Sequence, residues 1–248
     1  MTNNKLSVVI PAFNEEKNLH AGALDQVINY LSKQKFSYEV IIVDDGSKDE
    51  TVVIIEKLIK GLKNYRLIKN PHSGKAITVM TGVLEANGET ILFTDMDQAT
   101  PLGEIEKFFP MFSKGADIVI GERSGRKGAP MTRRISAWGF TVLRNLILGL
   151  PFPDTQCGFK AFNHKAVSKI FPDLLKRWQS LKSSGAAVNA GFDIEMLFIA
   201  RNKNLKILSV PVTWHHVGSD RVPFVKSALE GLRDIIRIKV NYILGKYN

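Results

Sequence analysis

Short runs rich in β-branched residues alternate with helical periodicity over the first 121 residues, and this alternation limits the chain to few folds. Strands are predicted over five runs: Leu6 to Ile10, Tyr38 to Val43, Tyr65 to Lys69, Thr90 to Thr94 and Asp117 to Gly121. Helices are predicted between them, over Ala23 to Leu31, Lys75 to Ala86 and Leu102 to Phe112. A further helix is predicted to start at a capping box formed by Ser47 and Glu50. Strands joined by crossover helices form an open, mostly parallel sheet with helices on both faces. The predicted fold class is therefore α/β.

The second half of the chain departs from this regular alternation. A helix is predicted over Arg134 to Leu150, a strand over Cys157 to Phe162, a helix over Phe192 to Asn202 and a strand over Leu205 to Thr213. From Val222 to Tyr247, apolar residues form one helical stripe and basic residues another, which predicts a basic amphipathic helix. Because there is no internal repeat or low-complexity linker, we expect one catalytic domain over residues 1–221 and a C-terminal helix over residues 222–248.

The formal net charge of +10 is divided unevenly along the chain. Residues 1–122 carry 13 Lys and Arg against 17 Asp and Glu, whereas residues 123–248 carry 21 against 7. Between positions 123 and 153 there are six basic residues and no acidic one. The basic half is expected to face something anionic: nucleic acid, an acidic membrane surface or a phosphorylated substrate. The alternative is a solvated basic loop.

The composition excludes several classes of protein. A single cysteine, Cys157, cannot form an internal disulfide, and no Cys/His cluster has the spacing of a zinc site. Pro11 interrupts the N-terminal apolar run and two glutamates follow it, so a signal peptide is not expected. Arg144 interrupts the best candidate for a membrane-spanning helix, which needs about 20 mostly apolar residues. We therefore expect a cytoplasmic protein.

Polar residues follow the predicted strands, at the edge of the sheet where ligands of such folds bind. The segments at this edge are Pro11 to Glu15, Asp44 to Ser47, Asn70 to Lys75 and Asp95 to Gln98. No G-x-G-x-x-G and no G-x-x-x-x-G-K-[ST] motif occurs, which argues against a dinucleotide-binding site and a P-loop. The expected site is an edge rich in carboxylates.

Asp95 and Asp97 are the first candidates for chemistry, because they follow the strand Thr90 to Thr94. Mg²⁺ prefers one or two carboxylates together with phosphate oxygens of a substrate. The alternative is a pair of turn or capping carboxylates before Pro101.

Two other loops at this edge carry groups suited to a nucleotide. A carboxylate of the Asp44–Asp45 pair can accept hydrogen bonds from a base or ribose, and Gly46 permits close approach of the backbone. Capping of the next helix is the alternative for this pair. Lys75 and the N-terminal amides of its helix are placed to approach phosphate, although a loop lysine is more often only solvated.

Seven motifs in this sequence appear together in one known family. They are VVIPAFNEE (8–16), VDDGSKDET (43–51), HSGKA (72–76), LFTDMDQATP (92–101), DTQCGFKAF (154–162), GFDIEMLFIA (191–200) and VPVTW (210–214). In these motifs the chain resembles the family 2 glycosyltransferases of the GT-A fold, and among them the polyprenyl (dolichyl) phosphate sugar synthases. The HSGKA and QCGFKAF blocks resemble the glucose enzymes more than the mannose enzymes.

The resemblance implies roles for individual residues. Pro11, Ala12, Asn14 and Glu15 would line the nucleotide pocket and Asp45 would hold the base or ribose, while Asp95 and Met96 would contact the nucleotide sugar together with Lys75. Asp97 would bind Mg²⁺ or Mn²⁺ on the diphosphate. Mannose-type members place a metal-binding Gln two residues after the second Asp, a position that is Ala99 here. Gln98 is the neighbouring candidate, so the second metal ligand is left open.

The implied reaction is transfer of a hexose, with inversion, from a nucleotide diphosphate sugar to a polyprenyl phosphate, and UDP-glucose is the favoured donor. Arg123, Arg133 and Arg134 are expected to bind the acceptor phosphate, because guanidinium groups match phosphate oxygens. The protein would act as a peripheral protein on the cytoplasmic membrane face.

Other functions stay open at this point. One is a GDP-mannose-dependent mannosyltransferase with the same acceptor. Another is a soluble family 2 transferase with a saccharide acceptor, in which Asp154 or Asp193 would serve as base. A non-enzymatic alternative is a basic protein that binds nucleic acid or a membrane surface, but the basic half contains no nucleic-acid module and no nucleic-acid partner is expected. A sugar nucleotidyltransferase would need a glycine-rich loop where Pro11 to Asn14 stand.

Overall fold

The computed structural model describes residues 6–123, 131–183, 191–215 and 224–247, with the backbone alone described for 131–138, 181–183 and 224–230. Its centre is a seven-stranded sheet with the order β3-β2-β1-β4-β6-β5-β7. The strands are β1 (Leu6–Ala12), β2 (Tyr38–Asp44), β3 (Tyr65–Lys69), β4 (Thr90–Thr94), β5 (Ile118–Arg123), β6 (Phe159–Asn163) and β7 (Ile207–Val212). Only β6 runs antiparallel to its neighbours in this sheet. The predicted mostly parallel α/β sheet is confirmed.

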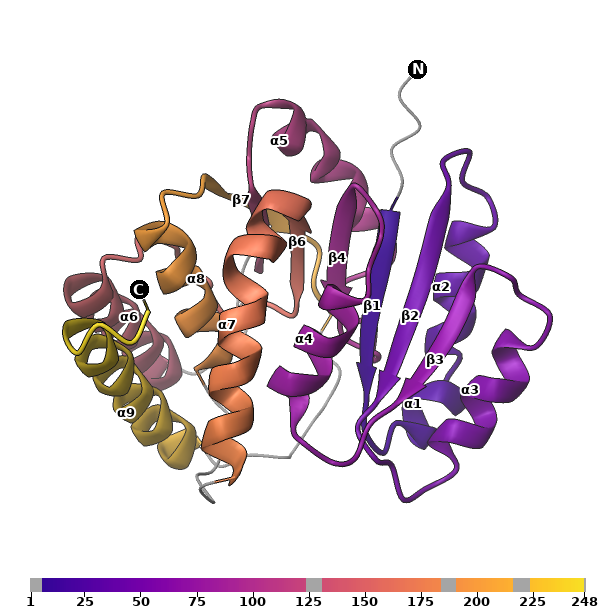
Figure 1. Ribbon diagram of the computed structural model, residues 1–248, viewed down its shortest axis with the longest axis horizontal. Helices are drawn as coiled ribbons and strands as arrows, with labels where there is room; N and C mark the ends of the chain where they lie inside the picture. Colours follow the sequence, from indigo (N-terminus) through magenta and orange to yellow (C-terminus); the bar gives the residue numbers. More distant parts are fainter. Residues whose placement is uncertain (1–5, 124–130, 184–190, 216–223, 248) are drawn as a thin grey trace.

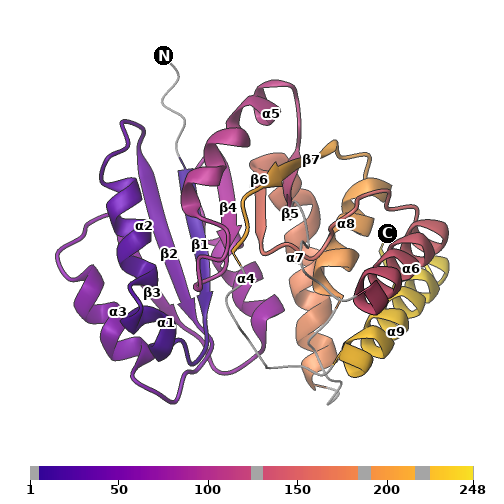
Figure 2. The ribbon, with the colours of Figure 1, turned by 180° about the vertical axis from the view of Figure 1, so that it is seen from behind.

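Helices cover both faces of the sheet, as Figures 1 and 2 show. One face carries α4 (Lys75–Leu84), α7 (His164–Ser183) and α8 (Phe192–Asn202). The other face carries α1 (Glu16–His20), α2 (Ala23–Leu31), α3 (Thr51–Ile59), the 3₁₀ helix η1 (Leu102–Lys107) and α5 (Phe109–Ser113). Two long helices, α6 (Met131–Leu148) and α9 (Phe224–Ile243), lie side by side beyond α8.

Alternation along the strands fills two apolar cores. Val9 and Ile41 point to the core under α4 and α7, whereas Val8 and Ile42 point to the core under α2 and α3. Ile235 and Ile238 of α9 are fully buried in the first of these cores. The predicted domain division at residues 221 and 222 falls outside the described residues, so it stays a prediction.

The predicted strands agree with the observed ones to within two residues at each end. The helix α7, by contrast, was not predicted. Its signal is present in the sequence, because Ala166, Ile170, Leu174 and Trp178 recur at helical spacing and are buried. Pro172 lies inside this helix, where proline normally weakens a helical prediction.

Two local predictions are wrong. Ser47 and Glu50 do not form a capping box, because α3 begins at Thr51 without a side-chain cap and the Ser47 hydroxyl instead accepts a hydrogen bond from the backbone of Asn14. The single helix predicted over Leu102 to Phe112 is divided into η1 and α5. Pro110 lies in the first turn of α5, where the missing N–H is tolerated, and the residue before a proline is disfavoured in the α conformation.

Within the described residues, no helix has the length and apolar character needed to cross a membrane. Arg144, which interrupts the apolar stretch of α6, is 2% exposed. Its guanidinium donates to the Thr155 hydroxyl at 2.9 Å and to the carbonyl of Phe152. The arginine therefore anchors α6 to the loop before β6.

Candidate active site

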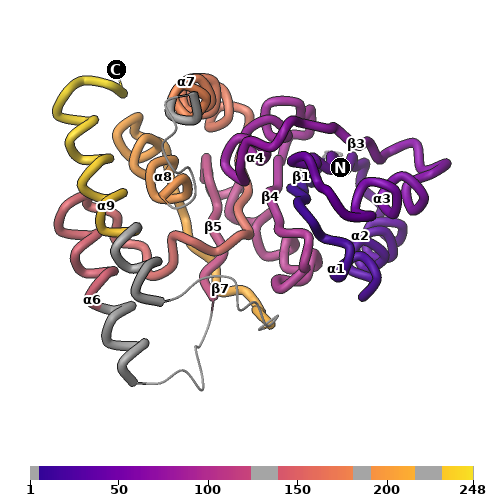
Figure 3. The backbone as a smooth tube through the Cα atoms, turned by 90° about the horizontal axis from the view of Figure 1, so that it is seen from below, coloured from indigo at the N-terminus to yellow at the C-terminus, as the bar shows by residue number. Residues whose placement is uncertain are grey.

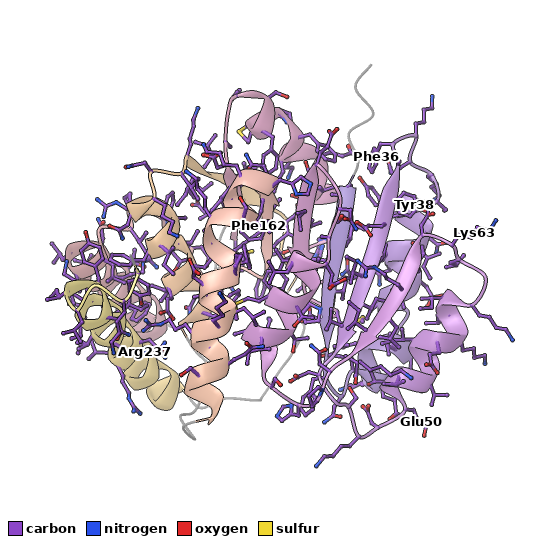
Figure 4. The ribbon with its side chains drawn as sticks, viewed as in Figure 1. Phe36, Tyr38, Glu50, Lys63, Phe162 and Arg237 are labelled. Carbon is purple, nitrogen blue, oxygen red and sulfur yellow. The ribbon has the colours of Figure 1, made fainter. Side chains whose placement is uncertain are left out.

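The candidate site lies at the edge of the sheet where the parallel strands end, which Figure 3 views from below. Figure 4 labels Glu50 near this edge and Phe36 and Tyr38 at the opposite one. Ala12 pairs with Asp44 at the ends of β1 and β2, and Thr94 of β4 pairs with Phe159 at the beginning of antiparallel β6. The antiparallel strand thus brings the 154–158 loop to the same edge as the four loops predicted from the sequence.

The first two loops are hydrogen-bonded to each other. Asn14 adopts a left-handed conformation with φ of 53°, its N–H donates to the Ser47 hydroxyl at 2.9 Å, and its side-chain oxygen accepts from the Lys48 N–H at 2.9 Å. The Glu15 N–H donates to the Thr51 hydroxyl at 2.7 Å. Pro11 and Ala12, which precede this turn, are buried. The segment from Pro11 to Glu15 is therefore a fixed wall of the site.

Asp45 holds the third loop in place. Its carboxylate is 3% exposed and accepts hydrogen bonds from the N–H groups of Ser73 at 2.7 Å and Gly74 at 2.9 Å. The His72 imidazole Nδ1 lies 2.8 Å from the same carboxylate. Gly46 has φ of 73°, and a Cβ there would lie 2.9 Å from the His72 nitrogen. The Asp-Gly pair thus joins two loops at close range.

A pair of stacked rings, which the sequence analysis missed, stands beside Asp45. The rings of Phe13 and His72 are 4.4 Å apart with an angle of 22° between their planes. His72 has 61% of its side chain exposed. A planar π-surface of this kind can stack on a nucleobase. The sequence contained a signal, since Phe13 lies between the predicted pocket residues Ala12 and Asn14.

The turn after β4 keeps Asp95 and Asp97 at the same edge. Gln98 has φ of 49°, and its side-chain nitrogen donates to the Asp95 carbonyl at 2.8 Å. Asp97 accepts a hydrogen bond from the Ala99 N–H at 3.0 Å. Met96, between the two carboxylates, is 2% exposed and belongs to the core under α2. A ligand at this turn would meet the backbone of Met96 rather than its side chain.

Gly158 allows the Asp95 side chain to lie close to the loop before β6. A Cβ at position 158 would lie 2.0 Å from Oδ2 of Asp95. Such a distance is impossible for real atoms, so any larger residue would displace the carboxylate. The sequence analysis did not single out this glycine, whose backbone lies against Asp95.

Lys75 contacts Asp95 directly. Its Nζ lies 2.6 Å from Oδ1 of Asp95 and 5.5 Å from the centre of the Phe93 ring, and 58% of its side chain is exposed. Desolvation lowers the pKa of Lys75, but the charges of Asp95, Asp193 and Asp97 outweigh it and raise the pKa above its usual value. The ammonium group is therefore charged at neutral pH and is attracted by three carboxylates.

Asp193 is held by a buried lysine that the sequence analysis missed. Lys160 is 0% exposed, its Nζ lies 2.6 Å from Oδ1 of Asp193, and it also donates to the carbonyl of Cys157. A buried charge is tolerated when it is paired and hydrogen-bonded in this way. The pair fixes the first turn of α8 beside the β4 turn.

Arg123 is paired with Asp154. Its Nε and one terminal nitrogen lie 2.5 Å and 2.9 Å from the two oxygens of Asp154, and its guanidinium lies 5.6 Å from the centre of the Trp214 ring. Burial raises the pKa of Asp154, but Arg123 and Lys160 more than offset this and hold it below its usual value. Several of the Arg123 N–H groups that were expected to bind a phosphate therefore already donate to Asp154. Arg133 and Arg134 lie in the first turn of α6, and their side chains are outside the described residues.

Asp95 and Asp97 are the carboxylates at this edge that could bind a divalent cation. In the described part of the chain, no group of three or more His, Cys, Asp and Glu residues is arranged to hold a metal. Asp95 and Asp97 nevertheless offer hard oxygen ligands, and Asp95 already attracts the cationic Lys75. Two carboxylates fit Mg²⁺ or Mn²⁺ when a bound diphosphate supplies further oxygens. The side-chain oxygen of Gln98, the residue after Asp97, is the candidate for a further protein ligand.

Comparison with known proteins agrees with this geometry. Residues 7–171 match the family described as "Glycosyl transferase family 2". The chain is 32% identical to the dolichyl-phosphate beta-glucosyltransferase of Dictyostelium discoideum over 97% of this chain and 75% of the relative. It is 33% identical to the human dolichyl-phosphate beta-glucosyltransferase over 98% of this chain and 77% of that protein.

Solved structures show the same fold at low identity. Glucosyl-3-phosphoglycerate synthase from Mycobacterium tuberculosis in complex with UDP superposes with a TM-score of 0.65 and 16% identity, over 95% of this chain and 80% of that one. The same synthase in complex with Mn²⁺, UDP and glucosyl-3-phosphoglycerate has a TM-score of 0.58 and 19% identity, over 98% and 80% of the two chains.

The fold is that of a GT-A glycosyltransferase. The chain belongs to glycosyl transferase family 2. The predicted family, fold and enzyme class are thereby confirmed.

Proposed function

We propose that this glycosyltransferase moves a hexose, with inversion, from a nucleotide diphosphate sugar to a polyprenyl phosphate at a membrane surface. The observation that carries the proposal is the cluster of Asp95, Asp97 and Lys75 at the strand ends, in a chain that matches dolichyl-phosphate beta-glucosyltransferases over 97% and 98% of its length. Such a cluster suits a diphosphate leaving group with its cation.

The donor nucleotide would occupy the loops after β1, β2 and β3. The rings of Phe13 and His72 offer a stacking surface for the base, while the wall from Pro11 to Glu15 closes one side. Asp45 would act chiefly by holding the 72–74 loop, because its carboxylate already accepts two backbone hydrogen bonds. UDP-glucose is the favoured donor, since the relatives named above are glucosyltransferases and the related fold was solved with UDP.

Asp97, with Asp95 beside it, would hold Mg²⁺ or Mn²⁺, and Gln98 is the candidate for a second protein ligand. A divalent cation at this place supplies charge compensation for the departing diphosphate, an effect typically worth several kcal/mol. Lys75 adds a positive charge at the same edge. Asp95, which is paired with Lys75 in the structure, would orient the sugar.

The acceptor needs little activation by the protein. A phosphate monoester has a second pKa near 6, so its oxygen is already anionic at neutral pH. Both carboxylates that could act as a general base, Asp154 and Asp193, are tied to cations in the structure. This pairing favours an acceptor that arrives ionised over a sugar hydroxyl. Arg133 and Arg134, with Arg123, are proposed to bind the acceptor phosphate.

Exposed apolar side chains on α6 and α9 support docking on a membrane. On α9, Ile236, Val240 and Ile243 form one exposed row, and on α6 Leu146 is 79% exposed. Exposed apolar surface beside basic residues is typical of proteins that lie in the interface of an anionic bilayer. The proposal places this contact on the cytoplasmic membrane face, with α9 as the docking helix.

A donor panel tests the proposed function. Radiolabelled UDP-glucose and GDP-mannose are each incubated with the protein, Mg²⁺ and a polyprenyl phosphate, and the label is followed into organic-extractable lipid. Transfer from UDP-glucose is expected. Transfer only from GDP-mannose would show that the proposed donor is wrong. Transfer only to a water-soluble saccharide would show that the proposed acceptor is wrong.

A further inference from the structure

We propose that Lys75 is an exchangeable counter-ion, which neutralises Asp95 in the empty enzyme and transfers to the diphosphate when the nucleotide binds. This inference rests on the proposed function for the identity of the anion. It assigns to Lys75 a role beyond simple attraction of phosphate, because the same ammonium group would compete with a divalent cation until the nucleotide arrives.

Two lysines serve the three carboxylates at this edge, and they differ in freedom to move. The Nζ atoms of Lys75 and Lys160 lie 5.5 Å and 5.9 Å from the centre of the Phe93 ring. Lys160 is fully buried and is fixed by both Asp193 and a backbone carbonyl. Lys75 has 58% of its side chain exposed, and its ion pair is to Asp95 alone. Only Lys75 is placed to exchange partners without disturbing the core.

The charges at the edge explain why an exchange would occur. Asp95, Asp97 and Asp193 carry three negative charges against the two positive charges of the lysines, so the empty site has a net charge of about minus one. A diphosphate brings further negative charge to this edge. The ammonium of Lys75 is attracted by these oxygens, and its departure exposes the Asp95 carboxylate to the sugar or the cation.

This arrangement predicts opposite effects of one substitution on two ligands. In Lys75→Met the carboxylates lose their internal cation, so nucleotide-free protein should bind Mn²⁺ about two- to fivefold more tightly, as expected for a half-exposed ion pair. The same variant should bind UDP in saturating Mn²⁺ roughly tenfold more weakly, because a charge-assisted hydrogen bond to the diphosphate is lost.

The experiment measures Mn²⁺ binding to nucleotide-free protein from the electron paramagnetic resonance signal of free Mn²⁺, and UDP binding by calorimetry. Lys48→Met is the matched control, because it removes the same charge from an exposed lysine of the neighbouring loop. Asp95→Asn and the double variant Asp95→Asn, Lys75→Met complete a cycle in which the gain in Mn²⁺ affinity should vanish. Lys75→Gln repeats the measurement if the methionine variant melts early.

Unchanged or weaker Mn²⁺ binding in both Lys75 variants would overturn the counter-ion role. Unchanged UDP affinity would overturn the transfer to the diphosphate. The gain in Mn²⁺ affinity is measured without an acceptor, so it should be seen even if wild type does not glycosylate lipid. Failure of the proposed acceptor and failure of this inference therefore give different results.

Discussion

At the scale of single residues, the carboxylates at the strand ends divide into those that build the site and those that face it. Asp44 accepts hydrogen bonds from the backbone of Gly46 and Ser47, and Asp45 accepts them from Ser73 and Gly74. Asp95 and Asp97 are less buried. The sequence predicted all four at one edge, but it could not show which of them are already bound within the protein.

Asp45→Ala is expected to weaken donor binding by loosening the 72–74 loop. The variant leaves two backbone N–H groups without their acceptor, at a cost of about 1–3 kcal/mol in stability. Calorimetry with UDP and urea denaturation measure the two effects. An unchanged UDP affinity would show that Asp45 has only a structural role, such as capping the next helix.

Gly158→Ala is expected to reduce turnover by tenfold or more with little loss of stability. The new methyl group would push the end of the flexible Asp95 side chain away from Lys75. If Asp95 has its proposed role, a displacement of about 1 Å can cost on the order of 100-fold in rate. Steady-state kinetics and thermal denaturation check this prediction. Normal turnover would show that the position of Asp95 is unimportant.

At the scale of helices and strands, α8 connects the site to the C-terminal helix. Asp193 in its first turn pairs with Lys160, and two residues later Glu195 is 0% exposed. Glu195 accepts hydrogen bonds from Trp178 of α7 at 3.0 Å and from Tyr247 at 2.6 Å. Arg237, labelled on α9 in Figure 4, lies 3.7 Å from the same carboxylate.

Tyr247→Phe is expected to lower the free energy of unfolding by about 1.5–3 kcal/mol, the usual contribution of a hydrogen bond to a charged group. Burial and the nearby Glu195 raise the pKa of Tyr247, so the hydroxyl remains a donor at neutral pH. Urea denaturation measures the change, and Tyr242→Phe, whose side chain is more exposed, is the control. Equal stabilities of the Tyr247 variant and wild type would show that the hydrogen bond from Tyr247 to Glu195 does not stabilise the fold.

The ion pair between β5 and the loop before β6 predicts a dependence of stability on pH. The folded-state pKa of Asp154 is lowered, so its contribution is complete above the usual carboxyl pKa of about 3.9 and is lost as the pH falls through the lower folded value. Wild type should therefore exceed Asp154→Asn in stability at pH 7, and the difference should shrink below about pH 4. A constant difference down to pH 2 would contradict this assignment.

The same scale shows why parts of the fold escaped prediction. Strand runs are short, apolar and bounded by turn residues, so their positions followed from the sequence. The helix α7 carries Pro172 and several lysines that hide its apolar stripe. Lys160 stands in a strand between Phe159 and Ala161, and nothing local shows that its charge meets Asp193, which is 33 residues away. Long-range pairs of this kind depend on topology.

At the scale of the whole molecule, the acidic half supplies the loops that we propose to bind the donor, and the basic half supplies α6 and α9. Each Lys or Arg near an anionic leaflet contributes about 1 kcal/mol of attraction, and exposed apolar side chains add burial. The double variant Leu146→Glu, Ile243→Glu should therefore lose cosedimentation with anionic vesicles while keeping its affinity for UDP.

Arg133→Ala, Arg134→Ala should lose lipid glycosylation more than donor binding, and binding of wild type to vesicles should fall as salt rises. Neutral vesicles serve as the control for the electrostatic part. If wild type does not bind anionic vesicles at low salt, the proposed docking of α6 and α9 on a membrane is wrong.

The most direct measurement is hexose transfer from radiolabelled UDP-glucose to a polyprenyl phosphate by wild type and by Asp97→Ala, with and without a chelator. The carboxylate edge predicts transfer into lipid by wild type with Mg²⁺ or Mn²⁺, and loss of it in the folded variant and in excess chelator. Full transfer by Asp97→Ala or in excess chelator, or transfer to a water-soluble saccharide with none to lipid, would contradict the account.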